Sequence, residues 1–387
     1  MRDLLLGSPN LDIDIVVEGD GIKFAEELAG LLKTQVIRHR QFGTATLAIR
    51  PDFKIDITTA RKEFYPEPAS LPVVYPGVLK DDLFRRDFTI NALAIMISGE
   101  KTSELIDFFH GQADLKQKKI RVLHPLSFID DPTRILRAIR FEQRYAFAIE
   151  PDTLRELEKA AKMKMLNRVG PQRLRDELIL LLKEAYPLKP LKRIKGLLGF
   201  SFINQNLSLT NADFKFLSRI EREIVWFKTR HKHRRRLDSW LIYFMGMIDG
   251  LTLRGVQKIC RNFVFRQGEE KRILDYKRRQ YKIFSLLRRH SLKPSRIYRI
   301  LEPLSYEVML LLKAKYKNEN LHRYIQDFLA TYNGVRILTK GKELQALGLS
   351  PGPAYQQIFN KVLNARIDGE IKTRDDELGF IRRIIAR

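Results

Sequence analysis

The segment Leu11 to Val17, LDIDIVV, constrains the fold of this chain more than any other stretch. Its branched apolar residues follow a Gly-Ser-Pro-Asn turn and predict a buried β-strand. Asp12 and Asp14 stand two residues apart, so both carboxylates leave the strand on the same face. Two such carboxylates repel each other, and a pair of divalent cations would relieve that repulsion. The segment therefore predicts a metal site; the alternative is a strand that leaves the core with both acids hydrated.

The chain is strongly basic. Its 387 residues include 71 Lys and Arg against 46 Asp and Glu, a formal net charge of +25. Such an excess predicts a polyanionic partner, with nucleic acid as the leading candidate and a membrane surface as the alternative. The single cysteine, Cys260, excludes an intramolecular disulfide and a cysteine-based zinc site. Because we recognise neither a membrane-spanning apolar run nor a signal peptide, we expect a cytoplasmic protein.

Strand-like and helix-like patterns mix before Asp130, and helical spacing dominates after it. Residues 44–50 and 53–61 predict two neighbouring strands, the second of which carries Asp56. Asp56 would add a third acid to the site of Asp12 and Asp14; the alternative is an edge-strand acid that faces water. Residues 62–82 hold four prolines and predict an irregular loop. We therefore expect an α/β region followed by a long all-helical remainder.

The segment Arg85 to Ala92, RRDFTINA, places two arginines beside an acid and interrupts an apolar run with an asparagine. Arginine suits a triphosphate because its planar guanidinium makes paired, charge-assisted hydrogen bonds. Arg86 is therefore a candidate phosphate ligand, and Asp87 or Asn91 a candidate partner of a ribose hydroxyl. The alternative is a salt-bridged entrance to a strand.

The predicted helix DDPTRILRAIRF spaces Asp131, Arg134, Arg137 and Arg140 three residues apart, along one face. An acid that accepts hydrogen bonds, next to an arginine that donates them, can read the edge of a base. Adenine and cytosine both present an amine donor beside a ring-nitrogen acceptor, so this pair would select A or C over G or U. The alternative is an intrahelical ion pair on a solvated basic face.

Basic stretches in the helical part predict contacts with a phosphate backbone. They run from Lys228 to Arg236 and from Lys277 to His290, with aromatic residues interleaved. The candidate RNA-binding residues are Arg230, Arg234, Arg235, Lys277 and Arg278, together with Gly348 and Gly352 in a helix-turn-helix segment whose backbone amides could hold a phosphate. Solvated helix faces are the alternative.

These segments together resemble the class II tRNA nucleotidyltransferases, a bacterial family of CCA-adding enzymes, A-adding enzymes and poly(A) polymerases. RDLLLGSPNLDIDIVVEG, RRDFTINALA, DFFHGQADL and DDPTRILRAIRF are similar to the first four motifs of this family. QRLRDELILLL resembles its neck helix, and ELQALGLSPGP a C-terminal segment. The resemblance implies an α/β, polymerase-β-like nucleotidyltransferase head followed by an all-α neck, body and tail.

The family's functional residues carry over onto matching positions. The resemblance implies that Asp12 and Asp14 hold Mg²⁺ in a two-metal site, with Asp56 as a possible addition to the metal shell. The remaining implied roles are triphosphate binding by Arg2 and Arg86, base selection by Asp131 and Arg134, and support of nucleotide binding by Arg137 and Arg140. The implied domains are a catalytic head (1–122), a neck with the base-selecting helix (123–187), a body (188–300) and a tRNA-binding tail (301–387).

The implied activity is Mg²⁺-dependent, template-independent transfer of a nucleotide from ATP, or also CTP, to the 3′ end of tRNA. The tRNA would be held on its acceptor and TΨC arm side, and we expect a monomer. Residues 62–82 lack the Asp-Gly and Arg-His-Pro pattern of full CCA-adding enzymes, which favours addition of the terminal A. Full CCA addition and poly(A) polymerase activity are alternatives, and a non-catalytic RNA-binding protein is a remoter one.

Two features depart from the family pattern. The first motif normally opens with Gly-Gly-x-Val before Arg-Asp, whereas this chain begins at Met1-Arg2. The glycines form a tight turn beside the triphosphate, so their absence suggests a fragment of a longer polypeptide. The fourth motif normally starts with Glu-Asp and here reads Asp130-Asp131, which keeps the base-reading acid.

Overall fold

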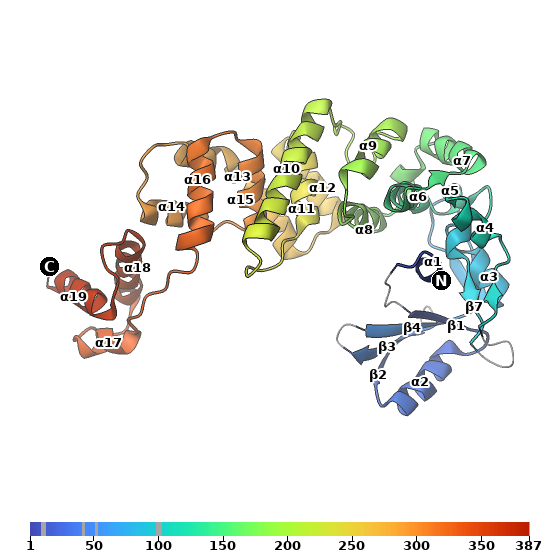
Figure 1. Ribbon diagram of the computed structural model, residues 1–387, viewed down its shortest axis with the longest axis horizontal. Helices are drawn as coiled ribbons and strands as arrows, with labels where there is room; N and C mark the ends of the chain where they lie inside the picture. Colours follow the sequence, from blue (N-terminus) through green and yellow to red (C-terminus); the bar gives the residue numbers. More distant parts are fainter. Residues whose placement is uncertain (9–12, 41–42, 51–52, 98–102, 387) are drawn as a thin grey trace. The chain divides into compact units, whose positions relative to one another are not determined.

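The structure is a computed structural model that describes residues 1–8, 13–40, 43–50, 53–97 and 103–386. It divides into two compact units, Met1–Gln205 and Asn206–Arg387 (Figure 1). Among the described residues, no helix combines the length and the apolar character that crossing a membrane requires.

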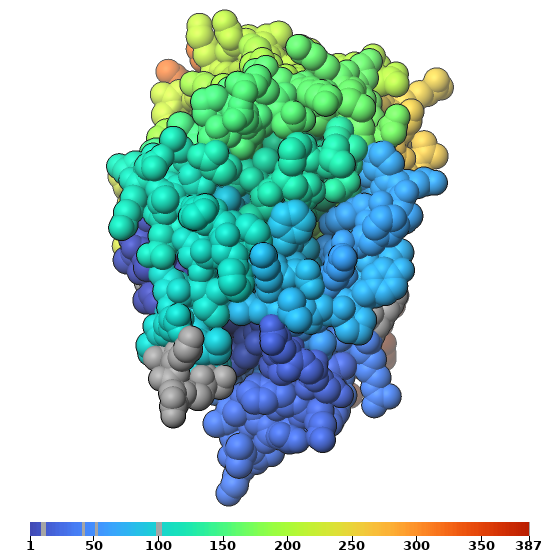
Figure 2. Space-filling view, turned by 90° about the vertical axis from the view of Figure 1, so that its right-hand side faces the viewer, coloured from blue at the N-terminus to red at the C-terminus, as the bar shows by residue number. Residues whose placement is uncertain are grey.

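The N-terminal unit begins with the short helix α1 (Arg2–Leu5) and a four-stranded sheet in the order β1-β4-β3-β2. The strands are β1 (Ile13–Val17), β2 (Gln35–His39), β3 (Thr44–Arg50) and β4 (Phe53–Thr59). β1 runs parallel to β4, while β2, β3 and β4 are antiparallel, so the expected pairing of residues 44–50 with 53–61 is confirmed. Helix α2 (Gly21–Leu32) packs on the sheet, where its alanines bury Leu47 and Ile57. Figure 2 shows this sheet region at the lower end of the unit, in dark blue.

β1 is an edge strand, not the buried strand that its branched residues predicted. Among the strands of the described residues it has one neighbour, β4, and its first residues, Ile13 and Asp14, are exposed. The apolar pattern was misleading because only one face of β1 is covered. The exposed end of the strand carries Asp14, which leaves this carboxylate accessible.

Residues 62–82 are not an irregular loop. β5 (Arg61–Phe64) and β6 (Val73–Pro76) form an antiparallel hairpin, which is followed by α3 (Leu79–Phe84). Pro76 is tolerated because it stands at the last position of β6, and proline is compatible with strand ends and edges. Gly77 comes next, and a Cβ there would lie 2.8 Å from the backbone nitrogen of Lys62. The other three prolines, Pro66, Pro68 and Pro72, lie in the loop that joins the two strands.

The segment after α3 enters the core, since Phe88, Ile90 and Ala92 are fully buried. Beyond Asp130 the described chain is helical apart from β10, which pairs with β9. The other elements of this unit are η2 (Thr89–Asn91), β7 (Ala94–Ile95), β8 (Leu105–Ile106), α4 (Gly111–Lys116), β9 (Lys119–Ile120), α5 (Ser127–Asp130), α6 (Thr133–Tyr145), β10 (Ala148–Ile149), α7 (Pro151–Lys162), η3 (Met165–Arg168), α8 (Pro171–Leu182) and α9 (Leu188–Leu197).

The C-terminal unit is helical throughout its described residues. Its centre is formed by α11 and α15, whose residues 240–247 and 307–314 are all buried. Its elements are α10 (Asn211–Arg230), α11 (Ser239–Met247), α12 (Leu253–Phe263), α13 (Gln267–Leu287), α14 (Pro294–Leu301), α15 (Tyr306–Lys315), α16 (Glu319–Asp327), the π-helical turn η4 (Phe328–Tyr332), α17 (Gly341–Ala346), α18 (Pro353–Ile367) and α19 (Arg374–Ile385). The last three helices share a small core around Leu344, Val362 and Ile381.

Candidate active site

A cavity of about 1140 Å³ lies in the N-terminal unit. It is lined by α1, β1, the segment after α3, and α6. Among the described lining residues are seven arginines and five acids: Arg2, Arg85, Arg86, Arg134, Arg137, Arg140 and Arg144, with Asp3, Asp14, Glu63, Asp87 and Asp131. The structure thus brings together nine of the side chains that the sequence singled out, including Asn91.

The predicted metal-binding acids differ in their surroundings. Asp12 lies outside the described residues. Asp14 is exposed, lines the cavity and accepts no hydrogen bond from the part of the chain that the structure describes. Asp56 stands beside Asp14 in the parallel register, but it does not line the cavity. Its carboxylate accepts hydrogen bonds from Thr46 Oγ1 (2.6 Å) and from Lys54 Nζ. Burial alone would raise the pKa of Asp56, but these two hydrogen bonds outweigh burial and lower it.

No three or more His, Cys, Asp or Glu residues gather into a metal-binding group among the residues described. Asp12 lies outside these residues, so the Asp12 and Asp14 pair stays a prediction. Asp14 fits it, because a carboxylate that accepts no hydrogen bond from the described residues, at the wall of a polar cavity, is a suitable ligand for a hard cation.

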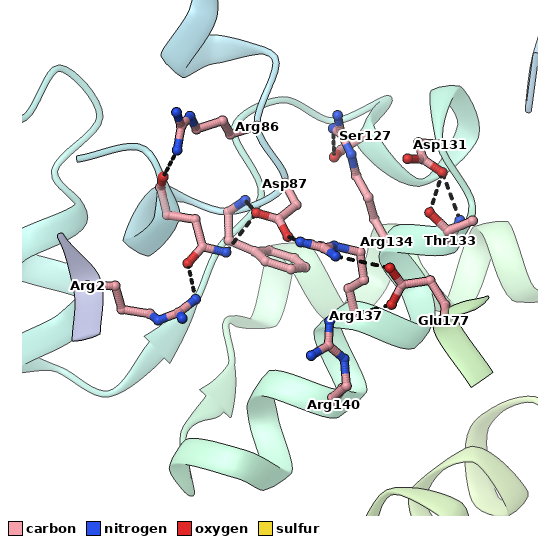
Figure 3. Close-up of polar contacts among 12 residues, drawn as sticks. Arg2, Arg86, Asp87, Ser127, Asp131, Thr133, Arg134, Arg137, Arg140 and Glu177 are labelled. Carbon is pink, nitrogen blue, oxygen red and sulfur yellow. Dashed lines mark hydrogen bonds and ion pairs between the residues drawn. The ribbon is translucent and has the colours of Figure 1, made fainter. Parts of the chain in front are cut away.

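A continuous hydrogen-bonded network runs across the cavity wall (Figure 3). Arg2 Nη1 donates to Asn91 Oδ1 (2.5 Å), and Asn91 Nδ2 donates to Asp87 Oδ1 (2.8 Å). Arg137 donates through Nε to Asp87 Oδ2 (2.8 Å) and through Nη1 to Glu177 Oε1 (3.0 Å). The network links α1, the RRDFTINA segment, α6 and α8, so these four segments hold one another in place.

Asp87 is the buried centre of this network, with 7% of its surface exposed. Its Oδ1 also accepts from the backbone N–H of Phe88 (2.9 Å), so both carboxylate oxygens are in use. Burial alone would raise the pKa of Asp87, but the charge of Arg137 lowers it below the usual value. Burial alone would lower the pKa of Arg137, but Asp87 and Glu177 raise it. Asp87 therefore positions Arg137 and Asn91, and its contacts do not leave it open for the ribose contact that the sequence suggested.

Two arginines of the cavity retain unused donors. Arg86 reaches the carbonyl oxygen of Asn91 (3.2 Å) and pairs with Asp82 at 3.4 Å. Arg140 is 5% exposed and reaches Glu177 at 3.5 Å. The Nε of each is buried and finds no acceptor among the described residues. Arginine side chains with a buried, spare N–H donor at the wall of a cavity are suited to bind an anion such as a phosphate.

Asp131 and Arg134 both line the cavity but are held separately. Arg134 is 4% exposed and donates to Ser127 Oγ (2.6 Å) and to the carbonyl oxygen of Arg85 (2.7 Å). Asp131 accepts from Arg173 of α8 (2.8 Å) and from Thr133. The alternative of an intrahelical ion pair on a solvated face is therefore wrong.

Sequence reasoning missed the partners Arg173 and Glu177. Both stand on α8 in the segment QRLRDEL, four residues apart and therefore on one helix face. This spacing is a usable signal, since two opposite charges on one face of a largely apolar helix indicate partners on a neighbouring element. It does not identify those partners.

The predicted RNA-binding residues of the C-terminal unit fall into two groups. Arg234 donates to the carbonyl oxygen of Leu329 (3.0 Å), Lys277 donates to that of Asp249 (2.6 Å), and Arg235 pairs with the fully buried Glu307 (2.6 Å). Arg230 and Arg278 are exposed instead. Each cation of the first group has a partner within the chain, although Arg234 also keeps a buried Nε without an acceptor among the described residues. The cations of the second group are exposed and available to a polyanion.

The two glycines flank the turn between α17 and α18. Gly348 adopts a left-handed conformation (φ +84°), which glycine favours. Gly352 is extended at φ 173° and precedes Pro353, the first residue of α18. The predicted helix-turn-helix segment is therefore present.

Comparisons with known proteins agree with this geometry. Residues 1–121 match the Poly A polymerase head domain. The A-adding tRNA nucleotidyltransferase of Geobacter sulfurreducens is 38% identical, over 99% of this chain and 44% of that protein. The A-adding tRNA nucleotidyltransferase of Halalkalibacterium halodurans is 31% identical, over 99% of this chain and 86% of that protein. The chain thus spans less than half the length of the first relative and most of the second.

A solved structure resembles the whole fold. It is described as a complex of a CCA-adding enzyme with ATP, and it superposes with a TM-score of 0.72 at 32% identity. The match covers 97% of this chain and 86% of that chain. The expected architecture, an α/β nucleotidyltransferase head with a helical remainder, is confirmed.

Proposed function

Because the chain belongs to the family of the class II tRNA nucleotidyltransferases and poly(A) polymerases, we propose that it transfers AMP from ATP to the 3′ end of tRNA and releases pyrophosphate. The observation that carries this proposal is the cavity of the N-terminal unit. Arginines with spare donors, an accessible Asp14 and the Asp131 and Arg134 pair line one space that can hold a nucleoside triphosphate.

The triphosphate is assigned to the arginine-rich part of the cavity. Arg86 and Arg140 offer buried N–H donors, and Arg2 and Arg137 are held in place by Asn91 and Asp87. Preorganised cations stabilise the charge that develops on phosphate oxygens during phosphoryl transfer without reorganising at the moment of reaction. Asp87 has the role of fixing Arg137 and Asn91, and Asn91 keeps an amide N–H for a ribose hydroxyl.

The base is assigned to Asp131 and Arg134. Asp131 can accept a hydrogen bond from the amine of adenine, and Arg134 can donate one to the adjacent ring nitrogen. Cytosine offers the same pattern, so full CCA addition is the runner-up. Addition of A alone is preferred, since the hairpin that replaces the expected loop lacks the CCA-enzyme pattern and the two relatives named above are A-adding enzymes.

Asp12 and Asp14 would hold Mg²⁺. A bound Mg²⁺ supplies Lewis-acid stabilisation of phosphate charge and lowers the pKa of a coordinated hydroxyl. The reaction itself is a substitution at phosphorus. The 3′ oxygen of the tRNA forms a bond to the α-phosphorus and releases its proton to solvent, while pyrophosphate leaves with the electrons of the broken P–O bond. The arginines orient the triphosphate for this attack and hold the pyrophosphate as it departs.

The tRNA is assigned to the helical part of the chain. The C-terminal unit carries 38 Lys and Arg against 18 Asp and Glu, which suits contacts with a phosphate backbone. Within it, exposed cations such as Arg230 and Arg278 are better candidates for these contacts than the internally paired Arg235. The division into head (1–122), neck (123–187), body (188–300) and tail (301–387) remains part of the proposal.

Nucleotide incorporation tests the proposal. The chain is incubated with Mg²⁺, one labelled nucleoside triphosphate at a time, and tRNAs that lack the last three, two, one or none of the terminal CCA nucleotides. Incorporation of A alone, and only into tRNA ending in CC, is expected. Incorporation of C would establish the CCA-adding alternative. Retained tRNA binding without incorporation would leave the chain as an RNA-binding protein and refute the proposal.

A further inference from the structure

Three hydrogen bonds converge on one oxygen of the Asp131 carboxylate. The backbone N–H of Thr133 (3.0 Å), its hydroxyl Oγ1 (2.6 Å) and Arg173 Nη2 (2.8 Å) all donate to Oδ1. Figure 3 shows the two bonds from Thr133 ending on the same oxygen. Oδ2 accepts no hydrogen bond from the described residues, and Asp131 lines the cavity. One oxygen is thus saturated and the other is left for a ligand.

The orientation of a carboxylate decides what it can recognise. The two oxygens of an aspartate are chemically equivalent, and the terminal torsion of the side chain is soft. Donors on one oxygen only remove that freedom and fix the direction of the remaining lone pairs. The Thr133 bonds come from the same helix start as Asp131, so they hold Oδ1 against the helix. Among the described residues, Arg173 is the one donor to Oδ1 that comes from another element, α8.

Arg173 is itself held at both ends of its guanidinium. While Nη2 donates to Asp131, Nη1 reaches the carbonyl oxygen of Ala69 (3.4 Å), between β5 and β6. The backbone N–H of Ala69 in turn donates to the carbonyl oxygen of Ile129 (3.1 Å), at the end of α5. Arg173 is not among the residues that line the cavity, whereas Asp131 is, so we expect Arg173 to act on the nucleotide through Asp131.

We propose that Arg173 is a positioning residue for base selection, because it orients Asp131 so that Oδ2 alone faces the base. This rests on the proposed function, in which Asp131 reads the base. A fixed Oδ2 accepts a hydrogen bond from the amine of adenine and repels the carbonyl oxygen that guanine presents at the same place. Without Arg173 the carboxylate of Asp131 can turn, and its preference for the adenine amine over the guanine carbonyl oxygen weakens.

The test is a selectivity ratio. For the wild-type chain, Arg173→Met and Arg173→Lys, kcat/KM is measured with ATP and with GTP on tRNA ending in CC. We expect Arg173→Met to reduce the ATP to GTP ratio about tenfold, chiefly by raising KM for ATP. Arg173→Lys keeps a donor to Oδ1 and should restore part of the ratio. A purely structural role would lower both rates together and leave the ratio unchanged, which would overturn the proposal.

A matched control separates this effect from a loss of packing. Arg193 of α9 pairs with Glu142 of α6 at 2.9 Å, and neither residue lines the cavity. Arg193→Met removes a similar ion pair from the same unit and should leave the ATP to GTP ratio unchanged. In the double variant Asp131→Ala/Arg173→Met, the ratio should equal that of Asp131→Ala, since Arg173 acts through Asp131. A further fall in the ratio would contradict this.

Measurements of ATP and GTP binding test the role of Arg173 independently of catalysis. If the wild-type chain transfers no nucleotide, the proposed function fails, but the ratio of ATP to GTP dissociation constants can still be measured. A reduced ratio for Arg173→Met would support the role of Arg173. An unreduced ratio would refute it, whatever the outcome for catalysis.

Discussion

The two units of this protein use their positive charges differently. The N-terminal unit holds 33 Lys and Arg against 28 Asp and Glu, whereas the C-terminal unit holds 38 against 18. In the first, arginines gather around one cavity and are fixed there by acids. In the second, helix α13 exposes Arg278, Arg279 and Lys282 without acidic partners among the described residues. The nearly balanced charge of the N-terminal unit, with its fixed arginines, suits one small anion such as a triphosphate. The exposed excess of positive charge in the C-terminal unit suits a long polyanion.

Each unit also contains a buried acid held by arginine. Asp87 pairs with Arg137 at 2.6 Å beside the cavity. Glu307, fully buried in α15, accepts from Arg235 at 2.8 and 2.6 Å and from the backbone N–H of Asp238. The first pair lines the cavity and the second does not. A buried acid and arginine therefore do not identify a site by themselves; the neighbouring cavity does.

The largest expected effect concerns catalysis at the cavity of the N-terminal unit. Asp14→Asn removes the accessible carboxylate at the edge of the cavity and should lower AMP transfer by about 10³-fold, because a metal ligand stabilises charge in the transition state. Single-turnover transfer to tRNA ending in CC measures this loss. The melting temperature should change little, since Asp14 is exposed.

Asp56→Asn is the matched control on the neighbouring strand. Its carboxylate is already engaged by Thr46 and Lys54, so we expect less than about a tenfold loss of transfer. An equal loss in both variants would mean that Asp56 also belongs to the metal site.

The next largest effect concerns stability and tests the buried acid of the C-terminal unit, Glu307. Glu307→Gln leaves Arg235 and Arg272 without their shared buried counter-charge, and it should lower the free energy of unfolding by about 3 kcal/mol. Denaturant unfolding measures this change. The KM for ATP should stay the same because Glu307 does not line the cavity. Glu319→Gln, an exposed acid of the same unit, should change stability by less than about 0.5 kcal/mol.

The same group predicts an acid-dependent loss of stability. Burial alone would raise the pKa of Glu307, but hydrogen bonds from Arg235 and the backbone lower it from 4.5 to about 2. The unfolded chain then takes up the proton first as the pH falls, so stability is full above about pH 4.5 and is lost towards pH 2. The loss amounts to about 3 kcal/mol. Glu307→Gln should flatten this part of a stability-against-pH curve, and an unchanged curve would contradict the assignment.

The smallest effect concerns the exposed cations. Replacing Arg278, Arg279 and Lys282 with alanine should weaken tRNA binding by about tenfold at moderate salt and reduce its salt dependence, since three phosphate contacts would be lost. Filter binding across a salt series measures both quantities. Three exposed cations of the N-terminal unit, Lys162, Lys164 and Arg168, provide the control. If alanine at these three positions weakens tRNA binding equally, the greater excess of positive charge in the C-terminal unit does not determine where tRNA binds.

Much of the candidate site could be predicted from the sequence because its residues stand in short segments with regular spacing. Helical spacing brought Arg134, Arg137 and Arg140 to one face of α6, and Asp131, which precedes that helix in an extended conformation, lines the cavity with them. RRDFTINA combined polar residues with an apolar run, and that segment is buried beside the same cavity. Helical periodicity was sufficient in the first case, and the residue types of one short segment in the second.

Other features depend on contacts between distant segments. The hairpin at residues 61–76 was missed since its prolines suggested a loop, whereas strand pairing depends on which residues face each other. Arg235 looked like an RNA ligand because its sequence neighbours are basic, yet its partner Glu307 is 72 residues away. Neither the pairing nor the partner is encoded in local spacing.

The sequence by itself determined the class of fold, the excess of positive charge and the residue types that surround a nucleotide. Those properties follow from the composition and period of single segments, which do not depend on the rest of the chain. The tertiary structure alone decided which charges remain available. It assigned Arg235 to Glu307, both oxygens of Asp87 to the network, and Oδ1 of Asp131 to Arg173. The physical reason is that a charged group binds whichever partner folding brings within hydrogen-bonding distance, and only the remaining donors and acceptors can serve a ligand.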